Sequence, residues 1–298
     1  IRLSLVGSEM CIRDSCYVLI QAGRTLYIIG VLGDHHLAAN FKRIMGWFCI
    51  SAVFWVTGAI LQGEWQILLW IIAAICDYTA PMHGFALPRL GRSDSSKEWT
   101  IEGHHLVERC QLFVIIAFGE TLLMTGASLS EVEEWTPLVI ISAVISFIGS
   151  LAMWWVYFDV SSEAGSRKIQ EVKNPGKLGL IYNAIHIVLV GALIICAVGD
   201  ELIVAHPEQE MRAEVVFVLI IGPIVYILAN SIYKYVTCRM LPLSHIIAVI
   251  ALALLLPWPY HISLLTMNIL VTSVFIFVIV FDMLFPNKGF KIKWEPKI

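Results

Sequence analysis

Nine stretches of mostly apolar residues follow one another along the chain, separated by short polar segments. A helix needs about 20 mostly apolar residues to cross the hydrocarbon core of a bilayer, which is about 30 Å thick. The pattern contains no strand-like alternation of useful length, so it predicts an all-α, polytopic transmembrane helical bundle of about nine spanning helices over residues 16–285. The expected spans lie near residues 16–33, 43–62, 65–82, 106–128, 136–158, 179–203, 214–233, 243–257 and 260–284.

The stretch 243–257 is short for a membrane span. We expect it to be tilted, re-entrant or tightly paired with the stretch that follows it across Pro257-Trp258-Pro259.

Residues 1–15 show neither a helical nor a strand period. The string from Ser4 to Ser15 resembles the in-frame translation of a sequencing adapter. We therefore expect residues 1–15 to be a non-native or disordered segment, with a short native extramembrane segment as the alternative. The natural protein is expected to extend further upstream.

The composition supports a membrane protein and limits the kinds of partner that the chain is expected to bind. Apolar residues make up 58% of the 298 residues and charged residues 14%, against roughly 45–50% and 25% in soluble domains. The net charge of −3 is not that of a nucleic-acid-binding chain. The seven cysteines include no C-x-x-C pair, which argues against a disulfide framework or a zinc site. The expected partners are the lipid bilayer and an unknown small solute or ion, with homo-oligomer formation left open and no cofactor expected.

Basic residues gather in alternate loops, and positive charge near span ends is retained in the cytoplasm. The intervening loops are either bare or acidic, and Asp200 is counted among their acidic residues. Their single basic residue is Arg212. This alternation predicts a multi-pass protein of the bacterial cytoplasmic membrane, with the C-terminus and a basic tail, residues 286–298, in the cytoplasm. The fifteen basic residues of the predicted cytoplasmic loops and tail are Lys42, Arg43, Arg89, Arg92, Lys97, Arg167, Lys168, Lys173, Lys177, Lys234, Arg239, Lys288, Lys291, Lys293 and Lys297.

One face of the span 106–128 carries three ionisable residues, His105, Arg109 and Glu120. Arg109 and Glu120 are separated by about 20° around the helix and about 16 Å along it, so they cannot pair directly. Arg24, near the middle of the first span, is a natural counter-ion for Glu120. Ionisable groups at membrane depth are costly and often mark a path for ions or protons. The alternative is that these charges lock the helices together.

Asp77 and His186 lie in the inner halves of their spans. They could join Glu120 and Arg24 on an ion or substrate path, or they could be core groups whose hydrogen bonds are satisfied locally.

Four glycines inside the apolar stretches are expected to let helices pack closely: Gly119, Gly126, Gly191 and Gly199.

Metal binding and soluble-type catalysis have little support. His104 or His105 with Glu108 could hold an ion from consecutive helical turns, but the pattern is not H-E-x-x-H and no second cluster accompanies it. No nucleophile-elbow, P-loop or dinucleotide motif occurs. We therefore expect no metal site and no catalytic residue.

Two segments of the chain that lie eighty residues apart have weakly similar sequences, and this internal similarity is called the echo. The segment Ala117-Phe-Gly119-Glu120 aligns with Ala197-Val-Gly199-Asp200. The echo is compatible with an ancient parallel duplication and equally with chance similarity between apolar helices.

Three ordered motifs resemble the bacterial low temperature requirement A family. The run from His105-Leu-Val-Glu108-Arg109 to Gly119-Glu120 resembles its signature helix. The resemblance continues in Trp154-Trp155-Val-Tyr157-Phe158-Asp159, and in Tyr182 to His186, Gly191, Ala197-Val-Gly199 and His206-Pro207. The family's early Trp-Glu-Leu-Phe-Phe-Asp type helix is missing here, which suggests an N-terminal truncation. The resemblance implies an integral membrane protein named for a cold-growth phenotype, with no established substrate.

The buried charges favour a secondary transporter or permease-like carrier of a small solute or ion. One alternative is a non-transporting membrane sensor or assembly module in the cold response. The other is an intramembrane enzyme acting on a lipid or quinone near His105, Glu108 and Arg109.

Overall fold

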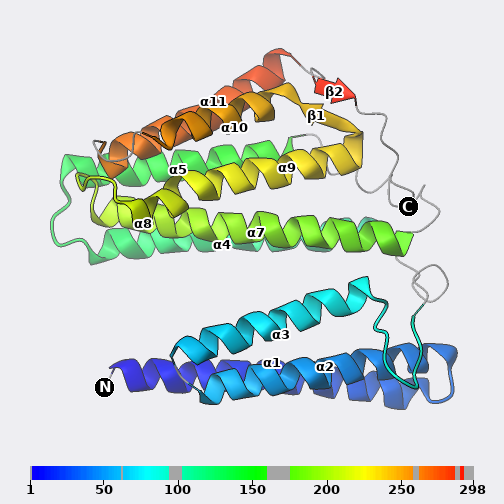
Figure 1. Cartoon of the computed structure of the whole chain (residues 1–298). Helices are drawn as coiled ribbons and strands as arrows, with labels where there is room; N and C mark the ends of the chain where they lie inside the picture. Colours follow the sequence, from blue (N-terminus) through cyan, green and yellow to red (C-terminus); the bar gives the residue numbers. More distant parts are fainter. Residues whose placement is uncertain are drawn as a thin grey trace. The chain divides into compact units, whose positions relative to one another are not determined.

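The computed structural model describes two compact units, residues 1–100 (unit 1) and 101–298 (unit 2). The described residues are 2–61, 63–93, 103–159, 175–257, 262–285 and 289–291. Within these ranges, the side chains of residues 2–14, 103, 104, 175, 214, 290 and 291 are not described. Helices make up almost all of the described chain, which confirms the all-α class (Figure 1).

Unit 1 consists of three consecutive helices, α1 (Arg2–Leu32), α2 (His36–Ile60) and α3 (Glu64–Met82), with α2 packed against both others. The ring Nδ1 of His35 accepts a hydrogen bond from the Leu37 N–H at 3.3 Å and so caps the start of α2. Helix α1 continues through residues 2–15, where the sequence shows no helical period. The non-native origin of that segment stays a prediction.

The turn that follows α3 is held to α2 by two side chains. The Arg43 guanidinium donates to the Leu90 carbonyl at 3.2 Å, and Trp47 Nε1 donates to the Ala86 carbonyl at 3.0 Å. Gly84 has φ +62°, and a Cβ there would lie 2.8 Å from the Ser93 carbonyl oxygen, so this turn requires glycine. Arg43, predicted from the sequence as a loop residue, is therefore a buried structural residue.

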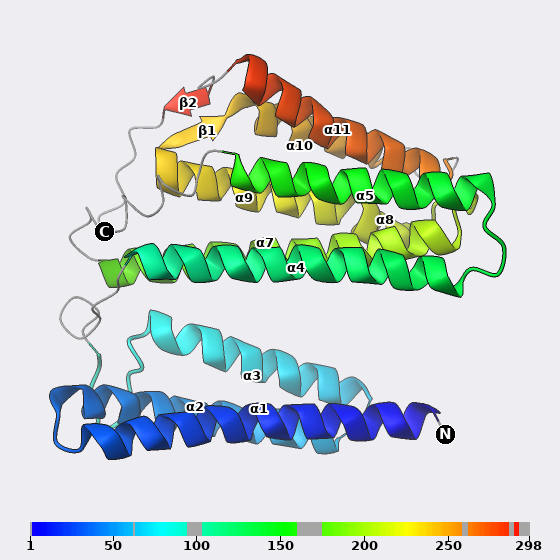
Figure 2. The same ribbon diagram turned by 180° about the vertical axis from the view of Figure 1, so that it is seen from behind.

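Unit 2 is built around the long helix α7 (Pro175–Ala205), which packs against α4 (Gly103–Glu131), α5 (Pro137–Phe158) and α9 (Gly222–Cys238). Helix α11 (Leu264–Leu284) packs against α5, and α10 (Leu243–Leu255) packs against α9 and α11 (Figure 2). A short helix, α8 (Ala213–Val216), and a π-helical turn, η1 (Phe217–Ile221), lead into α9. Leu189 and Leu193 of α7 are fully buried in the apolar core of this unit.

The starts of α5 and α11 follow from capping residues in the sequence. Thr136 accepts a hydrogen bond from the Val139 N–H, and Pro137 occupies the first helical position, where its missing N–H costs nothing. Ser263 accepts from the Thr266 N–H in the same way.

Backbone pairing defines the two ends of unit 2. Strand β1 (Met240–Pro242) pairs antiparallel with β2 (Gly289–Lys291), so α10 and α11 form a hairpin that returns to the end where α9 stops. At the opposite end, Glu210 forms an isolated bridge with Ser263. The loop after α7 and the loop before α11 therefore lie at the same end, in agreement with the alternation of charge along the sequence.

Lys234 lies at the β1–β2 end but does not belong to a loop. It is buried in α9 and pairs with Asp282 of α11 at 3.4 Å. Several other basic residues of the orientation argument lie outside the described residues: Lys97, Arg167, Lys168, Lys173, Lys288, Lys293 and Lys297.

Eight helices of the described chain are long and apolar enough to cross a membrane. The ninth apolar segment, α10, has 13 residues and a length of about 20 Å, which is short of the hydrocarbon thickness. This is the segment that the sequence marks as unusually short. Many large apolar side chains point outward, for example Leu123 at 69% exposure, as expected for helices that face lipid.

We expect Gly222→Ala to destabilise unit 2. A Cβ at Gly222 would lie 2.9 Å from Ile195 Cγ2 and 3.4 Å from Cys196 Sγ, so α7 and α9 would have to move apart. Overpacking of this kind costs about 1–3 kcal/mol. The matched control is Gly191→Ala, where a Cβ has no atom within 4 Å. Thermal unfolding in detergent should show a lower Tm for Gly222→Ala alone; equal Tm values would contradict the close packing.

Candidate functional site

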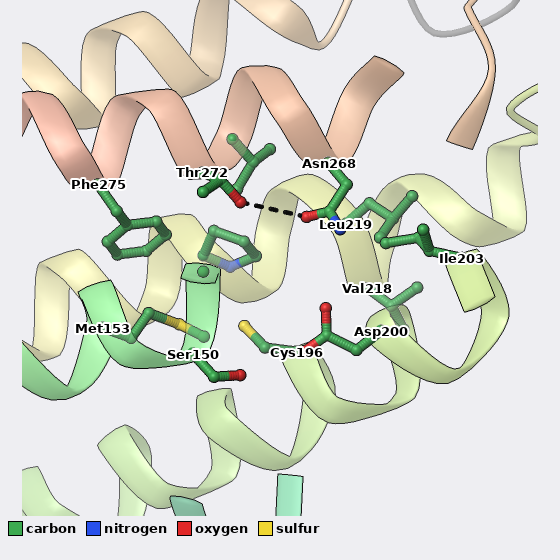
Figure 3. Close-up of a pocket in the computed structure, with 13 residues that line it drawn as sticks. Ser150, Met153, Cys196, Asp200, Ile203, Val218, Leu219, Asn268, Thr272 and Phe275 are labelled. Atoms are coloured by element: carbon green, nitrogen blue, oxygen red, sulfur yellow. Dashed lines mark hydrogen bonds between the residues drawn. The ribbon is translucent and has the colours of Figure 1, made fainter. Parts of the chain in front are cut away.

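A cavity of about 30 Å³ lies inside unit 2 and is bounded by residues of α5, α7, η1, α9 and α11. That volume accommodates about two water molecules. Figure 3 shows Asp200 and Cys196 on α7, Ser150 and Met153 on α5, and residues of α11 on the opposite wall. The polar residues that line the cavity are Ser150, Asp200, Asn268 and Thr272.

Asp200 is the acidic residue of this cavity. Its side chain is 7% exposed, and the hydroxyls of Ser146 and Ser150 lie near its carboxylate. Ser150 Oγ lies near this carboxylate but forms no hydrogen bond of good geometry in the described part of the chain. None of the described residues that line the cavity is Lys, Arg or His. A buried carboxylate without a compensating cation is costly, so the cavity favours a proton or another cation on Asp200.

Asn268 of α11 is oriented by two hydrogen bonds. Its Nδ2 donates to Ser146 Oγ at 2.9 Å, which links α11 to α5, and Thr272 Oγ1 donates to its Oδ1 at 3.4 Å. Gly149 permits this close approach, because a Cβ there would lie 2.9 Å from Thr272 Oγ1. The amide oxygen is thereby held on the wall of the cavity that contains Asp200.

The π-helical turn η1 contributes Val218 and Leu219 to the cavity. Pro223, the second residue after η1, has no N–H, so it can donate to neither the Val218 nor the Leu219 carbonyl. Gly199 lets this irregular backbone approach α7, because a Cβ at Gly199 would lie 2.9 Å from Leu219 Cδ2 and 3.5 Å from the Val218 oxygen. Single π-helical turns are frequent at functional sites.

A second buried polar cluster joins α5, α7 and α9. His186 Nδ1 lies 2.8 Å from the Tyr182 carbonyl oxygen, and because a carbonyl only accepts, Nδ1 carries the proton. Nε2 of the neutral ring then accepts from the Tyr157 hydroxyl at 2.8 Å. The hydroxyls of Tyr182 and Tyr233 are 3.0 Å apart, and the rings of Tyr157 and Tyr233 stack at 5.4 Å. His186, proposed from the sequence as a path or core group, is here an interhelical hydrogen-bonding group.

The other ionisable residues predicted in unit 2 lie on α4. His105, Arg109 and Glu120 are all exposed, whereas Val114 and Phe118 of the same helix are buried. The charged face of α4 is therefore not the face that packs in the core of unit 2.

The weak metal candidates are only partly described. His105 Nδ1 lies 3.3 Å from Glu108 Oε2, and the two side chains are 67% and 51% exposed. The side chain of His104 lies outside the described residues. The metal question therefore stays at the level of prediction.

The predicted residues of unit 1 have partners on their own or a neighbouring helix. Arg24 is exposed and donates to Gln21 Oε1 at 3.0 Å. Asp77 accepts a hydrogen bond from Trp55 Nε1 at 3.0 Å, which ties α3 to α2. This bond joins Asp77 to a neighbouring helix, and a role of Asp77 on an ion path stays a prediction. Arg24 and Glu120 belong to different units, and their pairing stays a prediction.

The four predicted packing glycines differ in their surroundings. A Cβ would meet no atom within 4 Å at Gly119, Gly126 or Gly191, whereas Gly199 packs against η1. For the first three glycines, a packing role stays a prediction.

Sequence reasoning missed Asp200 as a site residue, because it counted Asp200 among the acidic loop residues. The structure places it inside α7, five residues before the helix ends at Ala205. The available signal was the internal echo, which aligns Asp200 with Glu120. The two positions nevertheless differ, since Asp200 is buried and Glu120 is exposed.

We expect Tyr157→Phe to lower the stability of unit 2 by about 1–3 kcal/mol, because it leaves His186 Nε2 buried without a donor. The double variant Tyr157→Phe/His186→Phe should lose less than the sum of the two single variants, since it removes both partners. Thermal unfolding of all three variants measures this coupling. Strictly additive losses would show that the hydrogen bond contributes nothing.

Known proteins that resemble the chain show the family to which it belongs. The family model of the bacterial low temperature requirement A protein (LtrA) matches residues 10–280. An uncharacterized protein of Rhizobium meliloti (strain 1021) is 33% identical over 238 residues, which cover 78% of this chain. The chain spans 57% of the length of that relative. No solved structure matches the chain. Because the family model covers most of the sequence, including every helix that lines the cavity, this chain belongs to the bacterial low temperature requirement A family.

Proposed function

We propose that this membrane protein is a secondary carrier that moves a small cation, with Asp200 as the group that binds and releases it. The observation that supports the proposal most directly is the buried Asp200 carboxylate beside a cavity of about 30 Å³ in a bundle of membrane-spanning helices. Ionisable groups at membrane depth commonly mark substrate or ion pathways.

The energetics of Asp200 favour exchange of its cation. Without a Lys, Arg or His on the cavity wall, the ionised carboxylate is unstable, and occupation by a proton or another cation relieves the cost. A fixed Arg or Lys would neutralise the carboxylate permanently and leave no reason to bind an ion. The site is therefore of the kind that alternates between occupied and unoccupied states.

The π-helical turn supplies a backbone feature that suits such alternation. Transporters commonly bind ions where a spanning helix is interrupted, because freed carbonyl groups can then coordinate the ion. Here η1 and Pro223 interrupt the helix at the cavity wall.

The other candidate functions draw less support from the geometry. An intramembrane enzyme would need His105, Glu108 and Arg109 to converge on an opening. His105 and Glu108 instead pair within one helix, and none of the three residues lines the cavity. A sensor or assembly module in the cold response is the outcome that remains if transport is absent.

The charge alternation gives the proposed orientation. We place the β1–β2 end of unit 2 in the cytoplasm of a bacterial cell and the Glu210–Ser263 end outside, with the chain in the cytoplasmic membrane. The Asp200 cavity would then open toward the outer half of the bilayer.

We expect Asp200→Asn to reduce cation flux at least tenfold in proteoliposomes that contain the purified chain. Flux is measured as the change of a pH-sensitive dye and of ²²Na⁺ content under an imposed gradient. The matched control is Glu201→Gln, which makes the same change of charge one residue away, at a side chain that does not line the cavity. Glu120→Gln tests the charged face of α4 in the same assay.

Flux by the unaltered chain and by Glu201→Gln, but not by Asp200→Asn, is the expected pattern. If folded, unaltered protein carries neither protons nor alkali cations, the carrier proposal fails. If flux depends on Glu120 and not on Asp200, the path lies on α4 instead.

A further inference from the structure

We infer that the Asp200 cavity is a binding site for a dehydrated sodium ion. The inference rests on the proposed carrier function and names the cation that this function would use. It concerns a site formed entirely by residues of unit 2: Ser150 of α5, Asp200 of α7, and Asn268 and Thr272 of α11.

The donor atoms of the cavity suit a hard cation. Asp200 offers a carboxylate, Ser150 and Thr272 offer hydroxyls, and Asn268 offers an amide oxygen. Oxygen donors are the ligands that hard cations prefer. Cys196 and Met153 add soft sulfur atoms that such ions do not use.

Two of these oxygen atoms, those of the Ser150 hydroxyl and the Asn268 amide, are positioned to bind a cation. Ser150 is 3% exposed, and its Oγ forms no hydrogen bond of good geometry in the described part of the chain. A buried hydroxyl of this kind is costly unless something binds it. The Asn268 amide is fixed with its Nδ2 on Ser146, so that its Oδ1 is directed away from that bond. Figure 3 shows the Asn268 and Thr272 oxygens on the wall opposite Asp200.

Charge selects a monovalent ion. One carboxylate and one monovalent cation give a neutral site, whereas a divalent cation would leave one uncompensated positive charge among apolar helices. Ser150, Asp200 and Asn268 are each less than a tenth exposed, so the site lies within the bundle.

The cavity favours sodium over a proton. A proton on Asp200 would occupy no volume and would need at most one acceptor. The cavity instead has about 30 Å³ of space, a spare hydroxyl and an oriented amide oxygen. A sodium ion, which is smaller than a water molecule, fits this space, and the oxygen-bearing side chains of the wall are the hard donors that it prefers.

Sodium-dependent stability of the purified chain tests the inference. Thermal unfolding is measured in lipid nanodiscs at increasing NaCl, with choline chloride holding the ionic strength constant and KCl in a parallel series. The unaltered chain should gain about 4 °C in Tm for each tenfold increase of Na⁺ above its dissociation constant. KCl and choline chloride should give no comparable rise.

Three variants connect the response to the cavity. Asp200→Asn should lose the sodium response, and Ser150→Ala should need about ten times more Na⁺ for the same shift. Ser142→Ala, the control, removes a buried hydroxyl from the same helix as Ser150 at a residue that does not line the cavity, and it should respond as the unaltered chain does. If Asp200→Asn does not fold, Ser150→Ala and Ser142→Ala decide the question.

Each outcome bears on the inference. An equal rise with KCl, or a sodium response that persists in Asp200→Asn or is unchanged in Ser150→Ala, would overturn it. Stabilisation by acid alone, with no sodium response, would make the occupant a proton and leave the carrier proposal intact. A sodium response without any flux would retain the site and reject the carrier.

Discussion

Polar side chains inside the helical bundle need hydrogen-bond partners within the protein, because neither lipid nor apolar side chains can supply them. This constraint organises unit 2. Asn268 reaches across to Ser146, Tyr157 to His186, and Lys234 to Asp282. Each bond joins two different helices, so the polar residues determine which helices are neighbours and in what register. Asp200 differs from these three pairs because no Lys, Arg or His lies on the wall of its cavity, and the proposed function follows from that difference.

Helix α7 carries both of the polar clusters. His186 lies in its first half and Asp200 close to its end, about 21 Å apart along the helix axis. The His186 cluster is satisfied by groups that the chain itself supplies. The cavity beside Asp200 has no Lys, Arg or His on its wall, and the Ser150 hydroxyl there forms no hydrogen bond of good geometry in the described part of the chain. One helix therefore combines a rigid hydrogen-bonded region with a region prepared for a ligand, and small residues such as Gly199 keep that second region close to η1.

The residues that distinguish the family motifs divide between these two roles. Tyr157, Tyr182 and His186 belong to the satisfied cluster, and Gly199 belongs to the cavity wall. The signature helix α4 contributes its apolar side to the core, while His105, Arg109 and Glu120 remain exposed on it. A motif that is rich in charge thus need not surround the site, because helix packing buries the apolar face of an amphipathic segment.

The sequence alone determined the all-α membrane class, the positions of the long apolar helices and the unusual shortness of the segment at 243–257, since these depend on length and hydrophobicity. The capping residues Thr136 and Ser263 likewise mark the starts of α5 and α11 locally. Only the tertiary structure decided which polar groups are buried. Asp200 and Glu120 occupy equivalent places in similar short motifs, and their different exposure arises from the helices that surround them. The π-helical turn and the cavity are equally invisible in the sequence, because both result from how α7, α9 and α11 pack together.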